Sequence, residues 1–263
     1  MSRRAGTGAL VAGGVLALFA GVAAPAAAQV PLDAFFPLLT RRPVIEHEIE
    51  MRIVHHKRHD AGETTVSLGI EWPILPRWGV ALSVPLAFND PQATPFTAGA
   101  GDVELESKVI LFASADRHAL VTAGLALTLP TGSAGRGLGG ETVIEPFAAV
   151  GLVAADLLIV SDVGYVMALA GPDRDQRRIH AGLTVGRPTG RSLIPLLALT
   201  AASTLEGADA HDAGRRGGIE LSVAPGLNVQ ITPRATLGLG VQLPLTRARV
   251  ADYALFATID WEL

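Results

Sequence analysis

Apolar and charged residues alternate in the stretch IEHEIEMRI, residues 45–53. Its odd positions are mostly isoleucine or methionine, and its even positions are carboxylates or arginine. A repeat of two places all the carboxylates on one face of a strand, whereas a helical repeat of 3.6 would spread them around the axis. The stretch therefore predicts a β-strand with one apolar face and one acidic face.

The same alternation continues to the C-terminus and is again clear in VELESKVIL, residues 103–111. It predicts further strands, each of about the length that a tilted strand needs to cross a bilayer. The twelve expected strands cover residues 45–53, 65–72, 78–86, 103–111, 121–129, 144–152, 157–165, 178–185, 193–199, 219–231, 237–243 and 253–263.

The connections between these strands alternate in length. Short turns are expected at 75–77, 113–118, 154–156, 188–190 and 232–234, and longer connections at 89–101, 131–141, 169–177 and 204–218. Outer-membrane barrels combine short periplasmic turns with longer external loops in this way. An even number of strands also returns the C-terminus to the side of the short turns.

The two faces of the expected strands differ in charge. The apolar face carries no Asp, Glu, Lys or Arg, as lipid would require, because Arg or Lys at the bilayer midplane costs about 2–4 kcal/mol. The opposite face must be wet or densely paired, since burying its carboxylates in a dry core would be prohibitive. We therefore predict an all-β fold, a transmembrane antiparallel up-and-down β-barrel of 12 strands. The candidate lumen-lining residues are Glu46, Glu48, Glu50, Arg52, Glu71, Asp102, Glu104, Glu106, Lys108, Glu145, Asp162, Arg178 and Glu220, and Asp260 and Glu262 lie on the same face.

The N-terminus has the pattern of a secretory signal peptide. Residues 1–28 combine two arginines, an apolar run and three terminal alanines, so we expect this segment to be removed on export. Residues 29–43 are apolar without alternation and are bounded by prolines. This segment either plugs the barrel or rests on the membrane surface or periplasmic rim, and the second position is favoured. Residues 44–263 form the expected barrel.

Composition excludes several classes of partner and cofactor. The chain has no cysteine, so neither a disulfide nor a thiolate metal site can form. The formal net charge of -4 comes without a basic stripe, so nucleic acid is not an expected partner. Mean hydropathy is high, at +0.38, yet no apolar run after residue 28 is long enough for a transmembrane helix. No cofactor is expected.

Catalytic and metal sites are also not expected. A hydrolase would need a serine beside a histidine, but His47 lies on the first expected strand while Ser107 and Ser161 lie on the fourth and seventh. The stretch HHKRHD, residues 55–60, could bind a metal as a loop. A solvated charged loop is the commoner explanation, so we predict neither an enzyme nor a metal site.

Two short motifs resemble a known family. Gly99-Ala100-Gly101-Asp102-Val103, leading into Lys108, and Leu129-Pro130-Thr131-Gly132 resemble the outer-membrane β-barrel transporter family of the phenol-degradation (MetA-pathway) type. The resemblance implies a channel for small, often apolar or aromatic compounds.

Taken with the acidic inner face, these patterns predict a channel in the bacterial outer membrane for passive passage of small molecules. The expected partners are outer-membrane lipids, the barrel-assembly machinery and a small-molecule solute. An acidic lumen should favour cations. A structural or adhesive barrel with a filled lumen remains the alternative, followed by an outer-membrane enzyme.

Overall fold

Strands account for most of the chain in the computed structural model, which describes residues 32–59, 61–91, 95–116, 118–172, 174–190, 192–206 and 218–263. The expected signal peptide lies outside the described residues. Two short 3-10 turns occur, η1 (Leu32–Ala34) and η2 (Ala134–Arg136). The strands are β1 (Glu48–Arg58), β2 (Ala61–Leu75), β3 (Trp78–Pro91), β4 (Thr97–Ala100), β5 (Val103–Ala113), β6 (Ala119–Leu129), β7 (Thr142–Ala154), β8 (Leu157–Ala170), β9 (Arg177–Gly186), β10 (Leu193–Glu206), β11 (Glu220–Thr232), β12 (Ala235–Pro244) and β13 (Tyr253–Glu262).

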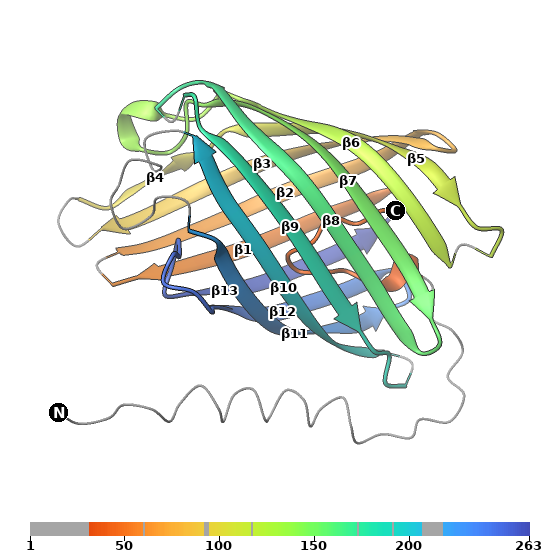
Figure 1. Cartoon of the computed structure of the whole chain (residues 1–263). Coiled ribbons are helices and arrows are strands. Elements are labelled where there is room, and N and C mark those ends of the chain that lie inside the picture. Colours follow the sequence, from red (N-terminus) through yellow and green to blue (C-terminus); the bar gives the residue numbers. More distant parts are fainter. Residues whose placement is uncertain are drawn as a thin grey trace, which may run out of the picture.

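These strands form one closed antiparallel barrel with tilted strands (Figure 1). The barrel closes where β1 pairs with β13, from Glu48 opposite Glu262 to Lys57 opposite Tyr253. Closure leaves none of the described strands as an open sheet edge, and the hydrocarbon interior of a bilayer requires such pairing of backbone groups. The expectation of an antiparallel barrel of 12 strands is confirmed.

The fourth position in the wall is one strand interrupted by a break. The first part of β3 pairs with β5, whereas residues 86–89 of β3 pair with β4. The break between β4 and β5 falls at Gly101 and Asp102. Part of the connection expected at 89–101 is therefore strand, because small residues such as those of β4 can pair without showing any alternation.

The first strand also differs from its prediction. It begins at Glu48, so Glu46 precedes the barrel wall, and it continues through His55 to Arg58. The stretch 55–60 is consequently not a loop over its first four residues, since its backbone pairs with β2 and β13. The polar histidines lie towards the end of the barrel, where alternation no longer has to satisfy lipid.

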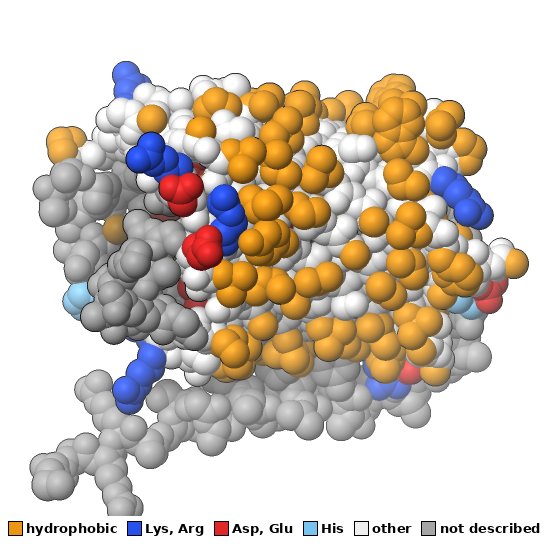
Figure 2. Space-filling view, turned by 45° about the horizontal axis from the view of Figure 1, so that its top comes forward, with side chains coloured by type: hydrophobic (Ala, Val, Ile, Leu, Met, Phe, Trp, Pro, Cys, Tyr) orange, Lys and Arg blue, Asp and Glu red, His pale blue; other side chains and the backbone are white. Residues whose placement is uncertain are grey.

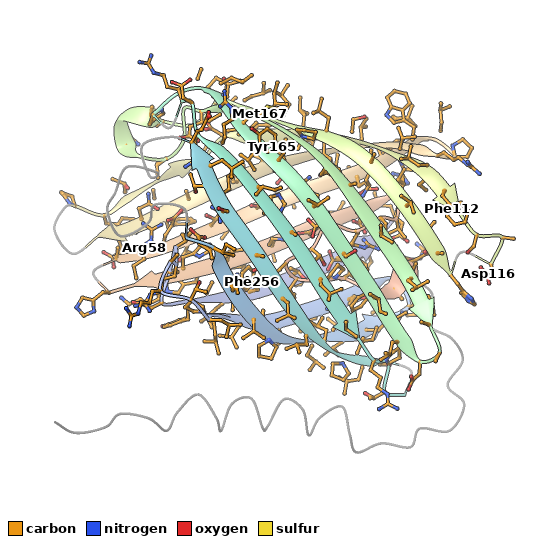
Figure 3. All side chains as sticks on the ribbon, viewed as in Figure 1. Arg58, Phe112, Asp116, Tyr165, Met167 and Phe256 are labelled. Carbon is orange, nitrogen blue, oxygen red and sulfur yellow. The ribbon has the colours of Figure 1, made fainter. Side chains whose placement is uncertain are left out.

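The outer surface is apolar, whereas the interior combines a buried apolar cluster with charged side chains. Leu68, Leu125 and Val163 point outward and are 58%, 48% and 45% exposed. Figure 2 shows hydrophobic side chains spread over the strands, with charged side chains towards the two ends. Asp116 and Arg58 lie at opposite ends of the barrel (Figure 3). Among the described residues, no helix is long and apolar enough to cross a membrane.

Candidate functional site

The segment before β1, residues 32–44, lies inside the barrel. Its apolar side chains join the buried core, with Phe35 0% and Leu38 1% exposed. Glycines on the inner face of the wall make room for them. A Cβ atom at Gly240 would overlap Leu38, and one at Gly186 would overlap Phe35. The segment is therefore packed against a wall of matching shape.

Three polar wall residues hold the backbone and side chains of this segment. Phe36 donates its backbone N–H to Asn228 Oδ1 at 3.2 Å, and Thr122 donates its hydroxyl to the Pro43 carbonyl oxygen at 2.5 Å. The hydroxyls of Thr40 and Thr184 lie 2.9 Å apart. Buried backbone groups need such partners. The segment occupies the lumen, not the membrane surface or rim that its apolar sequence favoured, because the inner wall offers it both apolar and polar contacts.

Two arginines end the segment, and each binds two carboxylates. Arg41 forms ion pairs with Glu106 on β5 and Glu145 on β7, and its guanidinium lies 4.3 Å from the ring centre of Phe147. Arg42 binds Glu46 at 2.7 Å and Glu48 at 2.6 Å. The segment is thus fastened to both sides of the acidic wall.

Burial and neighbouring charges shift the pKa values of Arg42 and Glu46 in opposite directions. Burial lowers the pKa of Arg42, but the carboxylates of Glu48 and Glu46 outweigh burial and the net pKa is raised. Burial raises the pKa of Glu46 to about 7, although the Arg42 guanidinium lowers it. Glu46 therefore changes charge near neutral pH while Arg42 stays protonated.

A cavity of about 520 Å³ lies between the segment and the wall, and a second cavity of about 260 Å³ lies near residues 248–251. Most of the sequence-predicted residues line the first: Glu48, Glu50, Arg52, Glu71, Asp102, Glu104, Glu106, Lys108, Glu145 and Asp162, together with Asp260. Arg178 and Glu220 line the second, where they form an ion pair at 2.9 Å. Glu46 lines neither and binds Arg42 instead.

The charge of the first cavity is only partly balanced. Among its described lining residues, nine carboxylates face four basic side chains. Sequence reasoning missed two of these four, Arg41 and Arg42, and also His180, which lies 2.9 Å from Glu145. The signal for the arginines was a basic pair at the end of an apolar segment that precedes an acidic strand.

Asp102, at the break between β4 and β5, holds the connection that follows β6. The carboxylate of Asp102 accepts backbone N–H groups from Gly132 at 2.7 Å, Gly140 at 2.8 Å and Glu141 at 2.8 Å. Gly140 has a φ of 98°, a conformation that favours glycine. Leu138 of the same connection is 3% exposed. The two motifs quoted from the sequence therefore meet in space, and their shared role in this structure is to fix this connection against the wall.

A closed barrel of this kind, with an apolar outer surface and a charged cavity inside, defines a bacterial outer-membrane β-barrel protein. Its fold is similar to a crystal structure of an outer-membrane channel from Pseudomonas putida F1, with 14% sequence identity, a TM-score of 0.67, and coverage of 87% of this chain and 100% of that chain. It is also similar to the NanC porin (14% identity, TM-score 0.56, 82% and 100% covered) and the KdgM porin (10% identity, TM-score 0.55, 82% and 99% covered).

At these identities the likeness establishes the fold. No family model matches the chain, and no curated protein matches it in sequence.

Proposed function

We propose that this chain is an outer-membrane channel for passive passage of small solutes, with its own segment 32–44 lying in the lumen. The observation that carries the proposal is the charged cavity of about 520 Å³ inside a closed barrel. A barrel built only to display loops has no need for such a space. The solved structures of similar fold include an outer-membrane channel and two porins, which supports the proposal.

The solute of this channel is small and cationic or polar. Unbalanced carboxylates attract counter-ions, and a low-dielectric wall strengthens that attraction. The resemblance to transporters of the phenol-degradation type implies apolar or aromatic compounds instead. An apolar solute in this cavity would strip water from carboxylates without replacing their hydrogen bonds, which is costly. The charge of the lining therefore favours cations.

A barrel with a permanently filled lumen is the second candidate, and the buried position of Leu38 and Phe35 favours it. In a channel, segment 32–44 must leave the lumen or let a solute pass beside it, whereas in a filled barrel it does neither. The close approach of Thr40 and Thr184, whose hydroxyls lie 2.9 Å apart, gives a means to test this. Because the chain has no cysteine, Thr40→Cys/Thr184→Cys introduces the only pair that can form a disulfide, which needs Cβ atoms about 3.5–4.5 Å apart.

The experiment records unitary currents in planar bilayers for the unsubstituted chain and for the double-cysteine variant, oxidised and then reduced. We expect cation-selective steps from the unsubstituted chain, smaller or rarer steps from the oxidised variant, and recovery on reduction. The single variant Thr184→Cys controls for the substitution itself. An absence of unitary steps from the unsubstituted chain and from both forms of the variant would rule out the channel and leave the filled barrel.

We propose two further partners: outer-membrane lipids around the apolar outer surface, and the barrel-assembly machinery, which would bind the C-terminal strand β13. No enzymatic role is proposed.

A further inference from the structure

The second cavity, of about 260 Å³, lies where the inner faces of β10, β11 and β12 meet the connection 245–252. Unlike the first cavity, it is balanced in charge. Both arginines among its described lining residues are paired with a carboxylate, Arg178 with Glu220 at 2.9 Å and Arg249 with Asp252 at 2.8 Å. The charges around this cavity therefore favour neither a cation nor an anion, and a ligand that fits it is neutral.

Three polar side chains on neighbouring strands meet in the lining of this cavity. Gln242 Nε2 donates to Ser222 Oγ at 2.5 Å and to Thr200 Oγ1 at 3.3 Å, and the two hydroxyl oxygens lie 2.5 Å apart. These bonds use both amide hydrogens and one hydroxyl hydrogen, so the other hydroxyl hydrogen stays free. Gln242 Oε1 accepts no hydrogen bond from the described residues. This polar trio thus offers a ligand both a donor and an acceptor.

The ion pair of Arg178 and Glu220 provides a second polar edge of the cavity. Glu220 and Ser222 lie on the same face of β11, about 7 Å apart along the strand. Arg178 binds Glu220 through Nη2 and a single carboxylate oxygen, so further guanidinium N–H groups and the second oxygen remain available to a ligand. Two neighbouring hydroxyl groups of one ligand can use such a pair, since one accepts from the guanidinium and the other donates to the carboxylate.

The connection 245–252 supplies apolar groups to the same lining, among them Ala248 and Val250. Hydrogen bonds hold this connection in place. Leu221 donates its backbone N–H to Thr246 Oγ1 at 3.0 Å, and the Thr246 hydroxyl donates to the Ala248 carbonyl oxygen at 2.9 Å. The cavity therefore combines two hydrogen-bonding edges with an apolar wall that is already ordered.

A ring compound with hydroxyl groups on its rim and C–H groups on its faces suits this arrangement. Each hydroxyl both donates and accepts, so one ligand can use the trio and the ion pair together. The volume lies just below the range of about 300–1,000 Å³ that is usual for small-molecule sites, which limits the ligand to a single ring. We propose that the second cavity binds a neutral monosaccharide or cyclic polyol. Binding does not require conduction, so the proposal goes beyond the channel function.

Calorimetric titration of the purified chain with D-glucose, in a detergent that carries no sugar, tests the site. Gln242→Met keeps the length of the side chain and removes the amide, so D-glucose should bind about tenfold more weakly. Thr200→Val keeps the branched shape and removes a hydroxyl, and it should also weaken binding, so the test does not depend on the folding of one variant. Cyclohexanol, a ring of the same size with one hydroxyl, should bind much more weakly than D-glucose.

Gln230→Met is the matched control, because it makes the same change elsewhere on β11, where Gln230 lines a different and smaller cavity. Binding of D-glucose that weakens in the test variants and persists in the control supports the site. No binding to the unsubstituted chain, equal affinity in all variants, an equal loss in the control, or equal affinity for cyclohexanol overturns it. Unitary currents without D-glucose binding would leave the channel standing and remove the sugar site, whereas binding without currents would do the reverse.

Discussion

The inward side chains on the two halves of the barrel interior have different roles, although both sets arise from the same alternation along the strands. On β9, β11 and β12 several inward positions are glycines, and Gly186, Gly226 and Gly240 make room for the apolar side chains of the segment. On β1 and β5 most inward positions that line the first cavity are charged, and Glu71 on β2 adds a further carboxylate. The difference teaches that small side chains on one half admit the apolar part of the segment, while charged side chains on the other half bind its arginines and line the cavity.

The largest effect should come from breaking a buried ion pair on the charged half. Lys108 is 5% exposed and lies 2.7 Å from Glu71. Lys108→Met should lower the free energy of unfolding by about 3–5 kcal/mol, because it leaves a buried charge uncompensated. Urea unfolding followed by tryptophan fluorescence measures the loss. Lys108→Met/Glu71→Leu should recover much of it, and a double variant no more stable than Lys108→Met would contradict this explanation.

A charged side chain should be tolerated at inward positions of this half of the wall and not at outward positions, which face lipid. Val84 is 40% exposed on the outer surface of β3, whereas its neighbour Ser83 lines the cavity. Val84→Arg should cost about 2–4 kcal/mol where it meets the middle of the bilayer, and Ser83→Arg much less. The yield of folded barrel after insertion into lipid vesicles gives the comparison. Similar yields for the two variants would show that the assignment of faces is wrong.

Enlarging a small inward side chain should lower stability on the half of the wall that packs against the segment, and not on the half that lines the cavity. Gly240→Val forces Leu38 out of its place and should cost about 1–3 kcal/mol, as overpacking of a core does. Ala81→Val adds two methyl groups on the cavity side, where there is room, and should change stability little. The two unfolding midpoints, measured under one set of conditions, settle the matter, and equal midpoints would argue against the packed half as the anchor.

The smallest effect should be the pH dependence of the attachment at Glu46. Its pKa is raised to about 7 in the folded chain and is close to its ordinary value when unfolded. The folded state therefore binds the proton more tightly, so this contribution to stability is full at acidic pH, declines as pH rises and is gone above about pH 7. Unfolding curves at pH 5, 6, 7 and 8 should show the unsubstituted chain losing stability relative to Glu46→Gln. Parallel curves for the two chains would disprove the link.

The barrel could be predicted from the sequence because lipid requires the outward side chains of every strand to be apolar. The outward positions of β2, β5 and β11 must be apolar whatever lies inside, so alternation is visible without any knowledge of the partner strands. β4 escaped prediction because Thr97–Ala100 is small on both faces. The extension of β1 through His55 escaped because backbone pairing near the end of the barrel needs no apolar side chain.

The interior was harder to predict, since its contacts join residues far apart in the chain. The sequence distance between Arg41 and its partner Glu145 is 104 residues, and no local pattern reports such a contact. The apolar residues of the segment suit a membrane surface as well as a lumen. The useful signal was the set of glycines at 226, 238 and 240 on two expected strands, inward positions that are too small to fill the barrel interior by themselves.

The threading of the segment has a consequence for how the chain is made. The segment touches β6 at Thr122 and β11 at Asn228, the latter contact being 192 residues away from Phe36. It adjoins β1, and the ring closes where β1 pairs with β13, the final strand in the described sequence. Contacts of such long range form late and slowly. We therefore expect the segment to be enclosed in the same step in which β1 pairs with β13, because the segment leads directly into β1.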